Sequence, residues 1–468
     1  MSTDELVARL EMLRSADLPT HGGRTLAYVY DSGLAEADEI GRHALAMYSS
    51  ANGLDPTAFP SLLTMENELV GFARELVGVP GAVGSVTSGG TESILLAVQA
   101  ARDARKVDRP VMVLPSTIHA AFHKAAHYFG VEAVVVDVDR ATKKADVDAT
   151  RAALEEFGDR VVLLAASAPS YAHGVIDPIE AFGALAAERG LRFHVDACIG
   201  GWVLPFSPTA PPWDLRVEGV TSLSVDLHKY AYTPKGASLL LHRTPELRRP
   251  QFFAYADWPG YTMLNATTQS TKSGGPLAAA WAVVQHIGRE GYATLARAAL
   301  GATNRLAEGI AAMEHLALAA DPESTLLSFG VDETLDVFTL SDEMLARGWF
   351  VQPQMRFGEL PATVHLTVSA ATASSVPQFL DDLAAAVNSA VAAGPVVVAP
   401  ELVAAAQATD PAELDDAAFD GLLELAGLGG GGAVALPERM APVNALLDVA
   451  PPRLREALLV AFLDRLTR

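Results

Sequence analysis

The sequence predicts an α/β protein with a mostly parallel sheet in a large domain, followed by a smaller α+β lobe. Six short apolar runs have strand character, and Pro, Gly or charged residues bound each of them. Helical patterns alternate with these runs between residues 61 and 285. Strands that are apolar along nearly their whole length are typical of parallel sheets covered by helices on both faces. The six runs are Val111–Leu114, Ala133–Val138, Val161–Ala165, Leu191–Val195, Ser222–Val225 and Ser238–Leu241.

The N-terminal segment, residues 1–60, is expected to hold one short helix and turn-rich sequence. Its first 14 residues, MSTDELVARLEMLR, have the pattern of an amphipathic helix, and Asn52–Pro56 has turn composition. The large domain is predicted over residues 61–285. It begins with helical spacing in Thr64–Val77, and a second helix over Glu92–Ala104 precedes the six strands.

The pattern changes near the end of the large domain. A long helix over Leu277–Met313 leads into residues 286–393, where two or three strand-like runs and a helix over Val376–Val391 predict the smaller domain. Residues 394–468 are rich in Ala, Pro and Gly and are predicted to form a helical extension. Gly429–Gly432 is expected to be a flexible break between two short helices.

The composition excludes several classes of protein. Among 468 residues, 34 are Lys or Arg and 56 are Asp or Glu, so the formal charge is −22. A general nucleic-acid-binding protein needs a basic face, so no nucleic-acid partner is expected. The single cysteine, Cys198, excludes a disulfide framework and a zinc site built from several cysteines. With 50% hydrophobic and 19% charged residues, the chain is expected to be an ordered globular protein.

No segment has the pattern of a targeting signal or a membrane span. The N-terminal helix carries acids where a signal peptide would carry basic residues. The most apolar stretch, Leu383–Pro400, is interrupted by polar residues and by Gly394-Pro395. We therefore expect a soluble, cytoplasmic protein with no membrane partner.

Lys229 is the first candidate for a chemical role. Lysine is scarce, with seven in the chain, and Lys229 follows a strand that is predicted to be buried. Burial lowers the pKa of a lysine because desolvation penalises the ammonium. A neutral amine can form a Schiff base with an aldehyde cofactor. The alternative is a lysine that reaches solvent from a strand end.

Asp196 closes the apolar strand Leu191–Val195. The carboxyl edge of a parallel sheet is where such folds place ligands. A carboxylate at this edge can keep a pyridinium nitrogen protonated, which makes a pyridoxal ring an electron sink. The alternative is an Asp that caps the next turn. Cys198, two residues on, is expected to serve packing only.

A glycine-rich turn opens the helix that begins near Glu92. It consists of Ser88, Gly89, Gly90 and Thr91. The free N–H groups and positive dipole end of such a helix suit a phosphate, and the hydroxyls of Ser88 and Thr91 add donors. The turn lacks Gly-Lys-Ser/Thr, so it is not a nucleotide P-loop. Most such turns are only helix starts, which is the alternative here.

His119 follows the strand Val111–Leu114 and is predicted to open a helix. An imidazole at this point can lie flat against a cofactor ring. His123 and His127 come four and eight positions later, which places all three on one face of such a helix. No Asp or Glu completes a zinc set, so no metal site is expected.

Together these segments supply what pyridoxal 5′-phosphate (PLP) requires. They provide a phosphate cup, a ring-stacking histidine, an acid for the ring nitrogen and a lysine for the aldehyde. They also occur in the chain order of the PLP-dependent transferase fold of the aspartate-aminotransferase type (fold type I). The sequence therefore predicts PLP as the cofactor.

Five stretches of this chain resemble the sphingosine-1-phosphate lyase family, within the group II PLP-dependent decarboxylases. The resemblance extends from about Tyr30 to Thr367 and continues more weakly beyond. The strings HGVIDPIE and HKYxYxPKG are more typical of the lyases than of the decarboxylases. The five stretches are VTSGGTES, HxxFxKAAHYFG at 119–130, SAPSYAHGVIDPIE at 167–180, HVDACIGG at 194–201 and SVDLHKYAYTPKG at 224–236.

The resemblance implies roles for individual residues. Lys229 would carry the Schiff base, Asp196 would face the pyridine nitrogen and His119 would stack on the ring. Gly90, Thr91 and His228 would lie near the cofactor phosphate. The remaining candidates for cofactor binding, in the matching stretches, are Ser88, Gly89, Ser167 and Ala197.

The resemblance also implies a homodimer with shared active sites. Thr271 matches a serine that family members lend from the neighbouring subunit. The segment 1–60 is expected to contribute to both the active site and the dimer. Tyr30 matches a tyrosine that lines the lyase site, and Lys235 is retained as well.

The chain departs from the family at the substrate end. Where family lyases have a histidine thought to help hold the substrate phosphate, this chain has Asp55, in the run Asn52-Gly-Leu-Asp55-Pro. A carboxylate beside a phosphate is repulsive. An arginine of the family is replaced by Lys272, which keeps the charge and loses the bidentate fork. Tyr30, Asn52, Asp55, Lys235 and Lys272 are the predicted substrate-binding residues.

The leading hypothesis is a PLP-dependent carbon–carbon lyase that cleaves a β-hydroxy amine by a retro-aldol step, with a substrate that need not be phosphorylated. Tyr30, Lys235 and Lys229 are candidates for proton handling. An amino-acid decarboxylase with the same cofactor residues is the alternative. A third hypothesis is a catalytically silent binding protein with this fold. The substrate of either enzyme is a small amine or amino acid.

Overall fold

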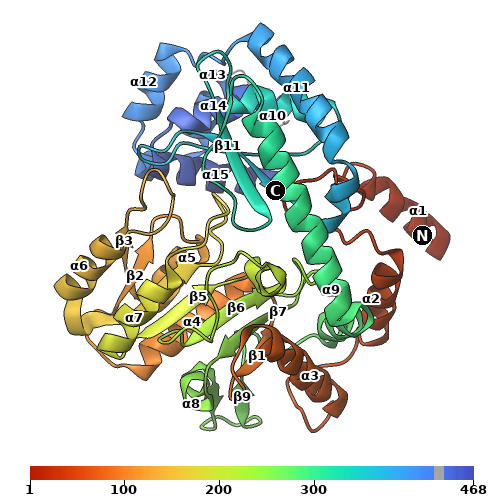
Figure 1. Cartoon of the computed structure of the whole chain (residues 1–468), viewed down its shortest axis with the longest axis vertical. Coiled ribbons are helices and arrows are strands. Elements are labelled where there is room, and N and C mark those ends of the chain that lie inside the picture. Colours follow the sequence, from red (N-terminus) through yellow and green to blue (C-terminus); the bar gives the residue numbers. More distant parts are fainter. Residues whose placement is uncertain (426–436, 468) are drawn as a thin grey trace. The chain divides into compact units, whose positions relative to one another are not determined.

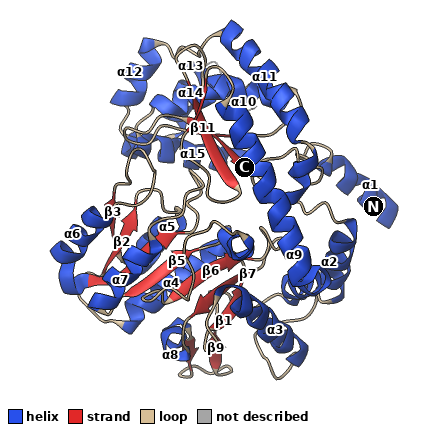
Figure 2. Ribbon diagram, viewed as in Figure 1, coloured by secondary structure: helices blue, strands red, loops and turns tan. Residues whose placement is uncertain are grey.

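The computed structural model describes residues 1–425 and 437–467, so the predicted break at Gly429–Gly432 lies outside the described residues. The chain forms two compact units (Figures 1 and 2). The first comprises Met1–Ala307, Ala320–Leu327 and Thr367–Val376. The second comprises Glu308–Ala319, Ser328–Leu366 and Pro377–Arg468. The structure thus divides the chain after Ala307, whereas the sequence predicts a boundary at 285.

The first unit contains a seven-stranded sheet in the order β1-β7-β6-β5-β4-β2-β3. Each of the six predicted strands is present, so this part of the prediction is confirmed. Neighbouring strands from β6 to β3 run parallel, and β7 runs antiparallel to both β6 and β1. The strands are β1 Val83–Thr87, β2 Val111–Pro115, β3 Glu132–Val136, β4 Val161–Ser167, β5 Arg192–Asp196, β6 Ser222–Asp226 and β7 Ser238–His242.

The edge strand β1 is the one strand of this sheet that the sequence pattern does not reveal. Its sequence, VGSVT, contains Gly84 and Ser85 in place of an apolar run. A Cβ at Gly84 would lie 2.6 Å from Leu241 Cδ2 and 2.9 Å from the Leu240 carbonyl oxygen. The glycine therefore allows close approach to β7, and the same glycine removes the strand signal.

Helices cover both faces of the sheet, as the apolar strands predict. In β2, Val111 and Val113 pack into one core, whereas Met112 and Leu114 pack into another. The second core lies under α4 and α5, and the first lies under α3, α6, α7 and α9. The helices of this unit are α1 Thr3–Arg14, α2 Ala35–Met47, α3 Pro60–Val77, α4 Gly90–Ala104, α5 Ala121–Phe129, α6 Val147–Phe157, α7 Ile179–Arg189 and α8 Pro245–Arg248. A two-stranded ribbon follows, with β8 Phe253–Tyr255 and β9 Met263–Asn265.

The long helix α9, Gly274–Ala311, corresponds to the predicted helix and is kinked at Gly288, where φ is +62°. The second unit has a four-stranded sheet in the order β10-β11-β13-β12, which fits the predicted α+β lobe. Four short helices, not only the predicted pair, lie in the described part of the C-terminal extension. The elements are β10 Leu316–Leu318, β11 Leu326–Val331, β12 Gln352–Gln354, β13 Thr363–Thr367, α10 Val337–Ala346, α11 Val376–Ala393, α12 Pro400–Ala408, α13 Asp416–Leu425, α14 Ala441–Val449 and α15 Pro452–Leu466.

Candidate active site

The sheet topology brings the predicted site segments to one edge. Strands β1, β2, β4, β5 and β6 point the same way, because β1 and β6 are both antiparallel to β7. Their carboxyl ends therefore meet at one edge of the sheet. The residues at or just after those ends are Ser88, His119, Ser167, Asp196 and Lys229.

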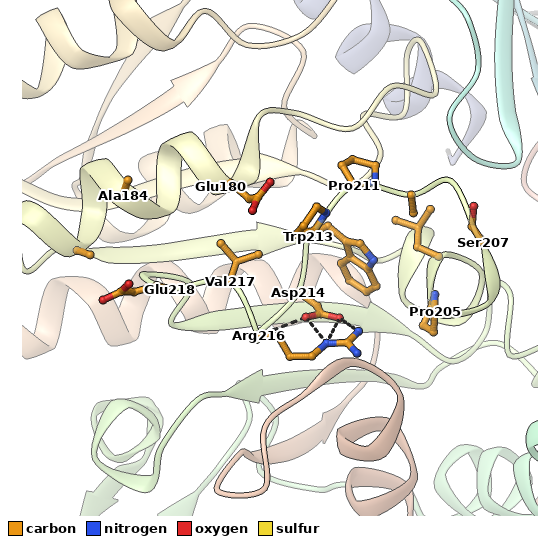
Figure 3. A pocket seen from close by; sticks show the side chains of 14 residues that line it. Glu180, Ala184, Pro205, Ser207, Pro211, Trp213, Asp214, Arg216, Val217 and Glu218 are labelled. Carbon is orange, nitrogen blue, oxygen red and sulfur yellow. Dashed lines mark hydrogen bonds and ion pairs between the residues drawn. The ribbon is translucent and has the colours of Figure 1, made fainter.

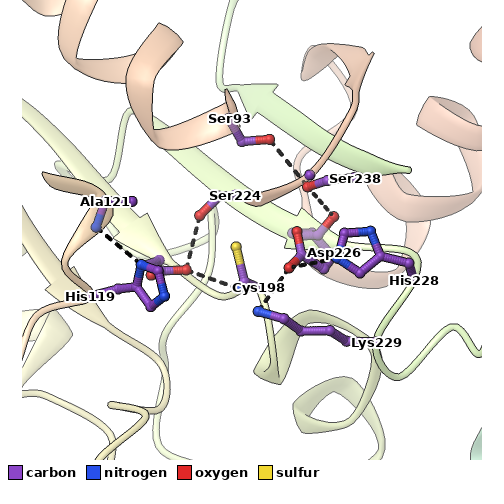
Figure 4. A network of polar contacts seen from close by, with 12 residues as sticks. Ser93, His119, Ala121, Cys198, Ser224, Asp226, His228, Lys229 and Ser238 are labelled. Carbon is purple, nitrogen blue, oxygen red and sulfur yellow. Dashed lines mark hydrogen bonds and ion pairs between the residues drawn. The ribbon is translucent and has the colours of Figure 1, made fainter. Parts of the chain in front are cut away.

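Lys229 forms an ion pair that the sequence analysis missed. Its Nζ lies 2.8 Å from Oδ2 of Asp226, the last residue of β6 (Figure 4). Asp226 is almost fully buried, and 21% of the Lys229 side chain is exposed. One feature of the sequence could have indicated this pair, since Asp226 stands three residues before Lys229 and ends a buried strand.

The ion pair overturns the predicted pKa of Lys229. Burial lowers the pKa of this amine, but Asp226 and weaker anionic neighbours outweigh burial and raise the pKa well above its usual value. Burial likewise raises the pKa of Asp226, but Lys229 and His228 outweigh it, so the net shift is downward. The bare chain therefore holds an ammonium at Lys229. A proton must leave this amine before it can react with an aldehyde.

The glycine turn at the start of α4 lies against the same ion pair. A Cβ at Gly90 would meet Cys198 Sγ at 2.5 Å and both carboxylate oxygens of Asp226 at 2.9 Å. A Cβ at Gly89 would lie 3.3 Å from Cε1 of His228. The Nδ1 atom of His228 is buried and has no hydrogen-bond partner among residues 1–425 and 437–467. A helix N-terminus without side chains, beside an unpaired imidazole nitrogen, fits the phosphate of PLP.

The hydroxyl-bearing residues of this turn, Ser88 and Thr91, are exposed. The Ser88 N–H donates to Glu92 Oε2 at 2.7 Å. Oε1 of Glu92 in turn accepts from the Thr268 N–H at 2.9 Å and from the Thr268 hydroxyl. Glu92 therefore ties the turn to the loop that carries Thr271, and no sequence pattern singled it out.

Asp196 lies at the end of β5 and is 8% exposed. Its Oδ1 atom accepts from the Cys198 N–H at 3.1 Å and from the Ser224 hydroxyl at 3.1 Å. Both donors bind the same oxygen, so Oδ2 is the atom that can face a ring nitrogen. The position of this carboxylate at the carboxyl end of β5 fits the ring nitrogen of PLP.

His119 is exposed and precedes α5, which begins at Ala121. Its Nδ1 accepts from the Ala121 N–H at 3.2 Å. The expectation that His119 shares a helical face with His123 and His127 is therefore wrong, because His119 lies two residues before α5 begins. Its hydrogen bond with the Ala121 N–H holds the ring at the sheet edge.

Ser167 and Ala197 are buried at the same edge, and Ser167 lies opposite Asp196 in the β4–β5 register. The Ser167 N–H donates to Asp177 Oδ2 at 2.8 Å, and Asp177 Oδ1 accepts from the Ala145 N–H at 2.9 Å. Burial raises the pKa of Asp177 to about 6, against these two hydrogen bonds. Asp177 of the HGVIDPIE string thus fixes the backbone at Ser167.

Tyr30 and Lys235 contact each other. The Lys235 Nζ lies 4.9 Å from the Tyr30 ring centroid and donates to the carbonyls of Tyr28 and His228 at 3.0 and 3.3 Å. Lys235 as a whole is exposed, and its amine is bound to these two carbonyls. Burial, then the charge of Lys229, lowers the pKa of Lys235 to about 8. Burial raises the pKa of Tyr30, which stays protonated.

The predicted substrate-end residues divide into two groups. Asn52 and Lys272 meet, because Asn52 Oδ1 accepts from the Lys272 N–H at 3.2 Å. The Lys272 ammonium forms an ion pair with Glu66 at 2.7 Å, and 16% of its side chain is exposed. Asp55 is exposed and caps its own turn through the Thr57 N–H at 2.8 Å. Hydrogen bonds from the Thr57 hydroxyl and N–H lower the pKa of Asp55.

A cavity of about 880 Å³ lies elsewhere in this unit (Figure 3). Residues of α7 and of the segment 204–218 line it, and the predicted site residues are not among them. Its one lining arginine, Arg216, is bound to the buried Asp214, with Nε 2.9 Å from Oδ1. Because this pair is neutral overall, the cavity offers no free cation for an anionic substrate.

Other classes of site receive no support from the described residues. In residues 1–425 and 437–467 no helix is long and apolar enough to cross a membrane. The same residues contain no group of three or more His, Cys, Asp or Glu arranged to hold a metal ion. Burial, together with Asp196 and Asp226, raises the pKa of Cys198 well above its usual value, so this residue is an unreactive thiol.

Comparisons with known proteins agree with this geometry. Residues 38–332 match the family described as the pyridoxal-dependent decarboxylase conserved domain. Residues 400–465 match a family described as a C-terminal putative HTH domain of pyridoxal-dependent enzymes.

Individual relatives point to one branch of that family. The chain is 38% identical to a sphingosine-1-phosphate lyase of Arabidopsis thaliana over 74% of this chain, and it spans 64% of that protein's length. It is 33% identical to the rice sphingosine-1-phosphate lyase, covering 81% of this chain and 72% of the other. A solved sphingosine-1-phosphate lyase of Burkholderia pseudomallei matches with a TM-score of 0.78 at 33% identity, covering 84% of this chain and 92% of the other.

Members of the matched family use pyridoxal 5′-phosphate, for which the edge of this sheet provides a glycine cradle, an unpaired imidazole, a carboxyl group and a lysine. The chain belongs to the pyridoxal-dependent decarboxylase family, in the branch that contains the sphingosine-1-phosphate lyases.

Proposed function

We propose that this protein is a PLP-dependent carbon–carbon lyase that cleaves a β-hydroxy amine into an amine fragment and an aldehyde. The observation that carries the proposal is the Lys229–Asp226 pair against the glycine turn at one sheet edge. The lyase branch of the family supports the same reaction class.

The residues divide the work of holding the cofactor. Lys229 would hold the aldehyde carbon, Asp196 the ring nitrogen, and His119 would lie against the ring. Gly89, Gly90, Thr91 and His228 would hold the phosphate, with Ser88, Ser167, Ala197 and the partner's Thr271 completing the pocket. When bound, the cofactor supplies an electron sink for the bond that breaks.

Two residues are suited to move the proton of the substrate hydroxyl. Lys235, with a pKa of about 8, is partly neutral near physiological pH and can accept that proton. Tyr30 stays protonated and can donate a hydrogen bond to the oxygen that leaves as an aldehyde. Asp226 stabilises the Lys229 ammonium through their ion pair.

The head group of the substrate is proposed to lack a phosphate. Asp55 is exposed and ionised where the family has a histidine, and it would repel a phosphate. The charge of Lys272 is neutralised by its ion pair with Glu66. Asn52 and Tyr30 remain as neutral contacts for a polar, uncharged end.

A decarboxylase is the second candidate. The matched family is described as a decarboxylase domain, and its cofactor residues would be the same. The ion-paired Lys272 favours a substrate whose only acid is the α-carboxylate.

The protein is also proposed to be a homodimer with shared sites. Thr271 is exposed on its own chain, which suits a residue lent to a neighbour. Light scattering of the purified protein measures the oligomeric state directly.

One experiment tests the proposed function. The holoenzyme is given a panel of β-hydroxy amines, with and without phosphate, and a panel of amino acids, and aldehyde and CO₂ are both measured. Aldehyde release supports the lyase, whereas CO₂ release alone supports the decarboxylase. A protein that stays colourless with added PLP contradicts both and supports the silent binding protein. PLP bound to a lysine of its enzyme absorbs at about 420 nm, and in Lys229→Ala this absorbance band should disappear. In Lys124→Ala, a lysine on the exposed face of α5, it should remain.

A further inference from the structure

Asp196 stands at the end of a buried chain of hydrogen bonds between β5 and β6. His194 Nδ1 lies 2.9 Å from Ser222 Oγ, and His194 Nε2 lies 3.2 Å from Ser224 Oγ. Ser224 Oγ continues to Asp196 Oδ1 at 3.1 Å (Figure 4 shows Ser224 in this network). His194 and Ser224 are completely buried, and Ser222 is 5% exposed.

The strand geometry explains why these four side chains meet. His194 pairs with Ser222 and Asp196 pairs with Ser224 in the parallel β5–β6 register. Residues two apart on a strand point to the same face, so the patterns His-x-Asp and Ser-x-Ser place all four side chains together. Phe122 covers the imidazole, with its ring centroid 5.9 Å away at an interplanar angle of 60°.

Counting protons gives the chain a direction. The Ser224 hydroxyl donates to Asp196 Oδ1, so its single proton is used in that bond. Ser224 must then accept from His194, which requires the proton on Nε2. Nδ1 is left as an acceptor for the Ser222 hydroxyl. Burial lowers the pKa of His194 to about 4, against the charge of Asp196, so the ring is neutral and has one proton to place.

The directed series of hydrogen bonds ends on the Asp196 carboxylate. A hydrogen bond donated to a carboxylate stabilises the ionised state, and successive hydrogen bonds polarise one another. An ionised acid at Oδ2 is what a protonated pyridine nitrogen requires. We propose that His194 is a positioning residue which, through Ser224, aims the Asp196 carboxylate at the cofactor ring nitrogen. The proposal rests on the proposed function, because it assigns that nitrogen to Asp196.

A purely structural role for His194 would give a different pattern in variants. His194→Leu and Ser224→Ala each interrupt the series of hydrogen bonds that leads to Asp196, at two different points. His194→Gln keeps an amide N–H that can donate to Ser224. His242 provides a matched control, since it is 1% exposed, lies on β7 and binds Gln251 at 3.0 Å outside this chain. His242→Leu should cost stability as His194→Leu does.

The first measurement uses the apoprotein with ¹⁵N-labelled histidine. NMR should show His194 with its proton on Nε2 at neutral pH. A proton on Nδ1 would reverse the chain and overturn the proposal, and this result does not depend on cofactor binding. A wild-type protein that binds no PLP would instead defeat the proposed function and, with it, the role assigned to the chain.

The second measurement uses the holoenzyme loaded with PLP labelled with ¹⁵N at the ring nitrogen. The wild type, His194→Gln and His242→Leu should show the shift of a protonated nitrogen. His194→Leu and Ser224→Ala should show a shift towards the unprotonated value, with kcat reduced about tenfold because a hydrogen bond to a charge is lost. An unchanged nitrogen signal in Ser224→Ala, with the wild-type kcat, would overturn the proposal.

Discussion

At the scale of single residues, the proton inventory of the site depends on how each amine is surrounded. Lys229 and Lys235 are both placed near Tyr30, yet their pKa values move in opposite directions. Lys229 has a carboxylate at 2.8 Å, whereas Lys235 binds two backbone carbonyls, which carry no net charge. Burial therefore decides the pKa of Lys235, and the ion pair decides that of Lys229.

The activity should consequently rise with pH through the titration of Lys235. Its pKa is lowered to about 8, so the neutral amine that can accept a proton increases from neutral to mildly basic pH. Lys235→Met should remove this dependence and reduce kcat/KM. The measurement is the pH profile of kcat/KM for the wild type and the variant. A wild-type profile that persists in Lys235→Met would assign the titration to another group.

Gly90 is predicted to tolerate no side chain. Gly90→Ala would place a methyl group 2.5 Å from Cys198 Sγ and 2.9 Å from the Asp226 carboxylate, so these buried side chains would have to shift. Overpacking of this kind costs about 1–3 kcal/mol in free energy of unfolding, and the displaced Asp226 should also weaken PLP binding. Urea unfolding and PLP titration measure the two effects.

Gly71→Ala is the control for that substitution. Gly71 lies within α3, and a Cβ there has no neighbour within 4 Å. Alanine at this position should stabilise the protein by up to about 1 kcal/mol, since glycine is a poor helix former. Equal stability changes in the two variants would show that the close contacts at Gly90 are unimportant.

At the scale of elements, the sequence predicts those strands and helices whose buried residues form a recognisable apolar pattern. The runs that become β2 and β4 are apolar along nearly their whole length and are predicted as strands. The sequence pattern does not reveal β1, because Gly84 allows the close approach of β7 and, with Ser85, interrupts the apolar run. The site residues at strand ends were predictable for the same reason, because the ends of recognised strands fix the edge of the sheet.

The partners of those site residues were not predictable in this way. Asp226 and Glu92 act through contacts with Lys229 and Thr268, and only the fold determines which acid meets which donor. The pKa of Lys229 was predicted with the wrong sign because its partner was unknown. Likewise, the ion pair between Lys272 and Glu66 joins α3 to a distant loop.

Glu92 connects α4 to the loop that contains Thr268, so its removal should lower both stability and PLP affinity. Glu92→Ala removes the acceptor for the Ser88 N–H, the Thr268 N–H and the Thr268 hydroxyl. The free energy of unfolding should fall by about 3 kcal/mol, because each of these three hydrogen bonds contributes about 1 kcal/mol. PLP affinity should fall as well, since both the glycine turn and the loop lose their anchor. Thermal unfolding and PLP titration of Glu92→Ala and Glu92→Gln provide the measurement, and Glu92→Gln should lose less because it keeps one acceptor oxygen. Unchanged PLP affinity in Glu92→Ala would contradict this role.

At the scale of the whole molecule, the charge of −22 bears on the C-terminal segment that matches a putative HTH domain. Residues 400–465 contain eleven acidic residues and four arginines. Three of these arginines are engaged, because Arg439 pairs with Glu343, Arg465 pairs with Asp420 and Arg455 donates to backbone carbonyls. Binding to DNA depends on basic side chains that neutralise phosphates, and this segment offers none in excess.

The full-length protein should therefore show no salt-dependent binding to duplex DNA. Non-specific DNA-binding proteins have Kd values of about 10⁻⁴–10⁻⁶ M at physiological salt, and their affinity increases steeply as salt is lowered. Fluorescence anisotropy with a labelled duplex, at physiological and at low salt, should give no saturable signal for this protein. Arg453→Glu, at the start of α15, should leave that result unchanged. A Kd in the micromolar range that weakens with salt, and weakens further in Arg453→Glu, would show that four helices with an acid excess can still present a local basic face to DNA.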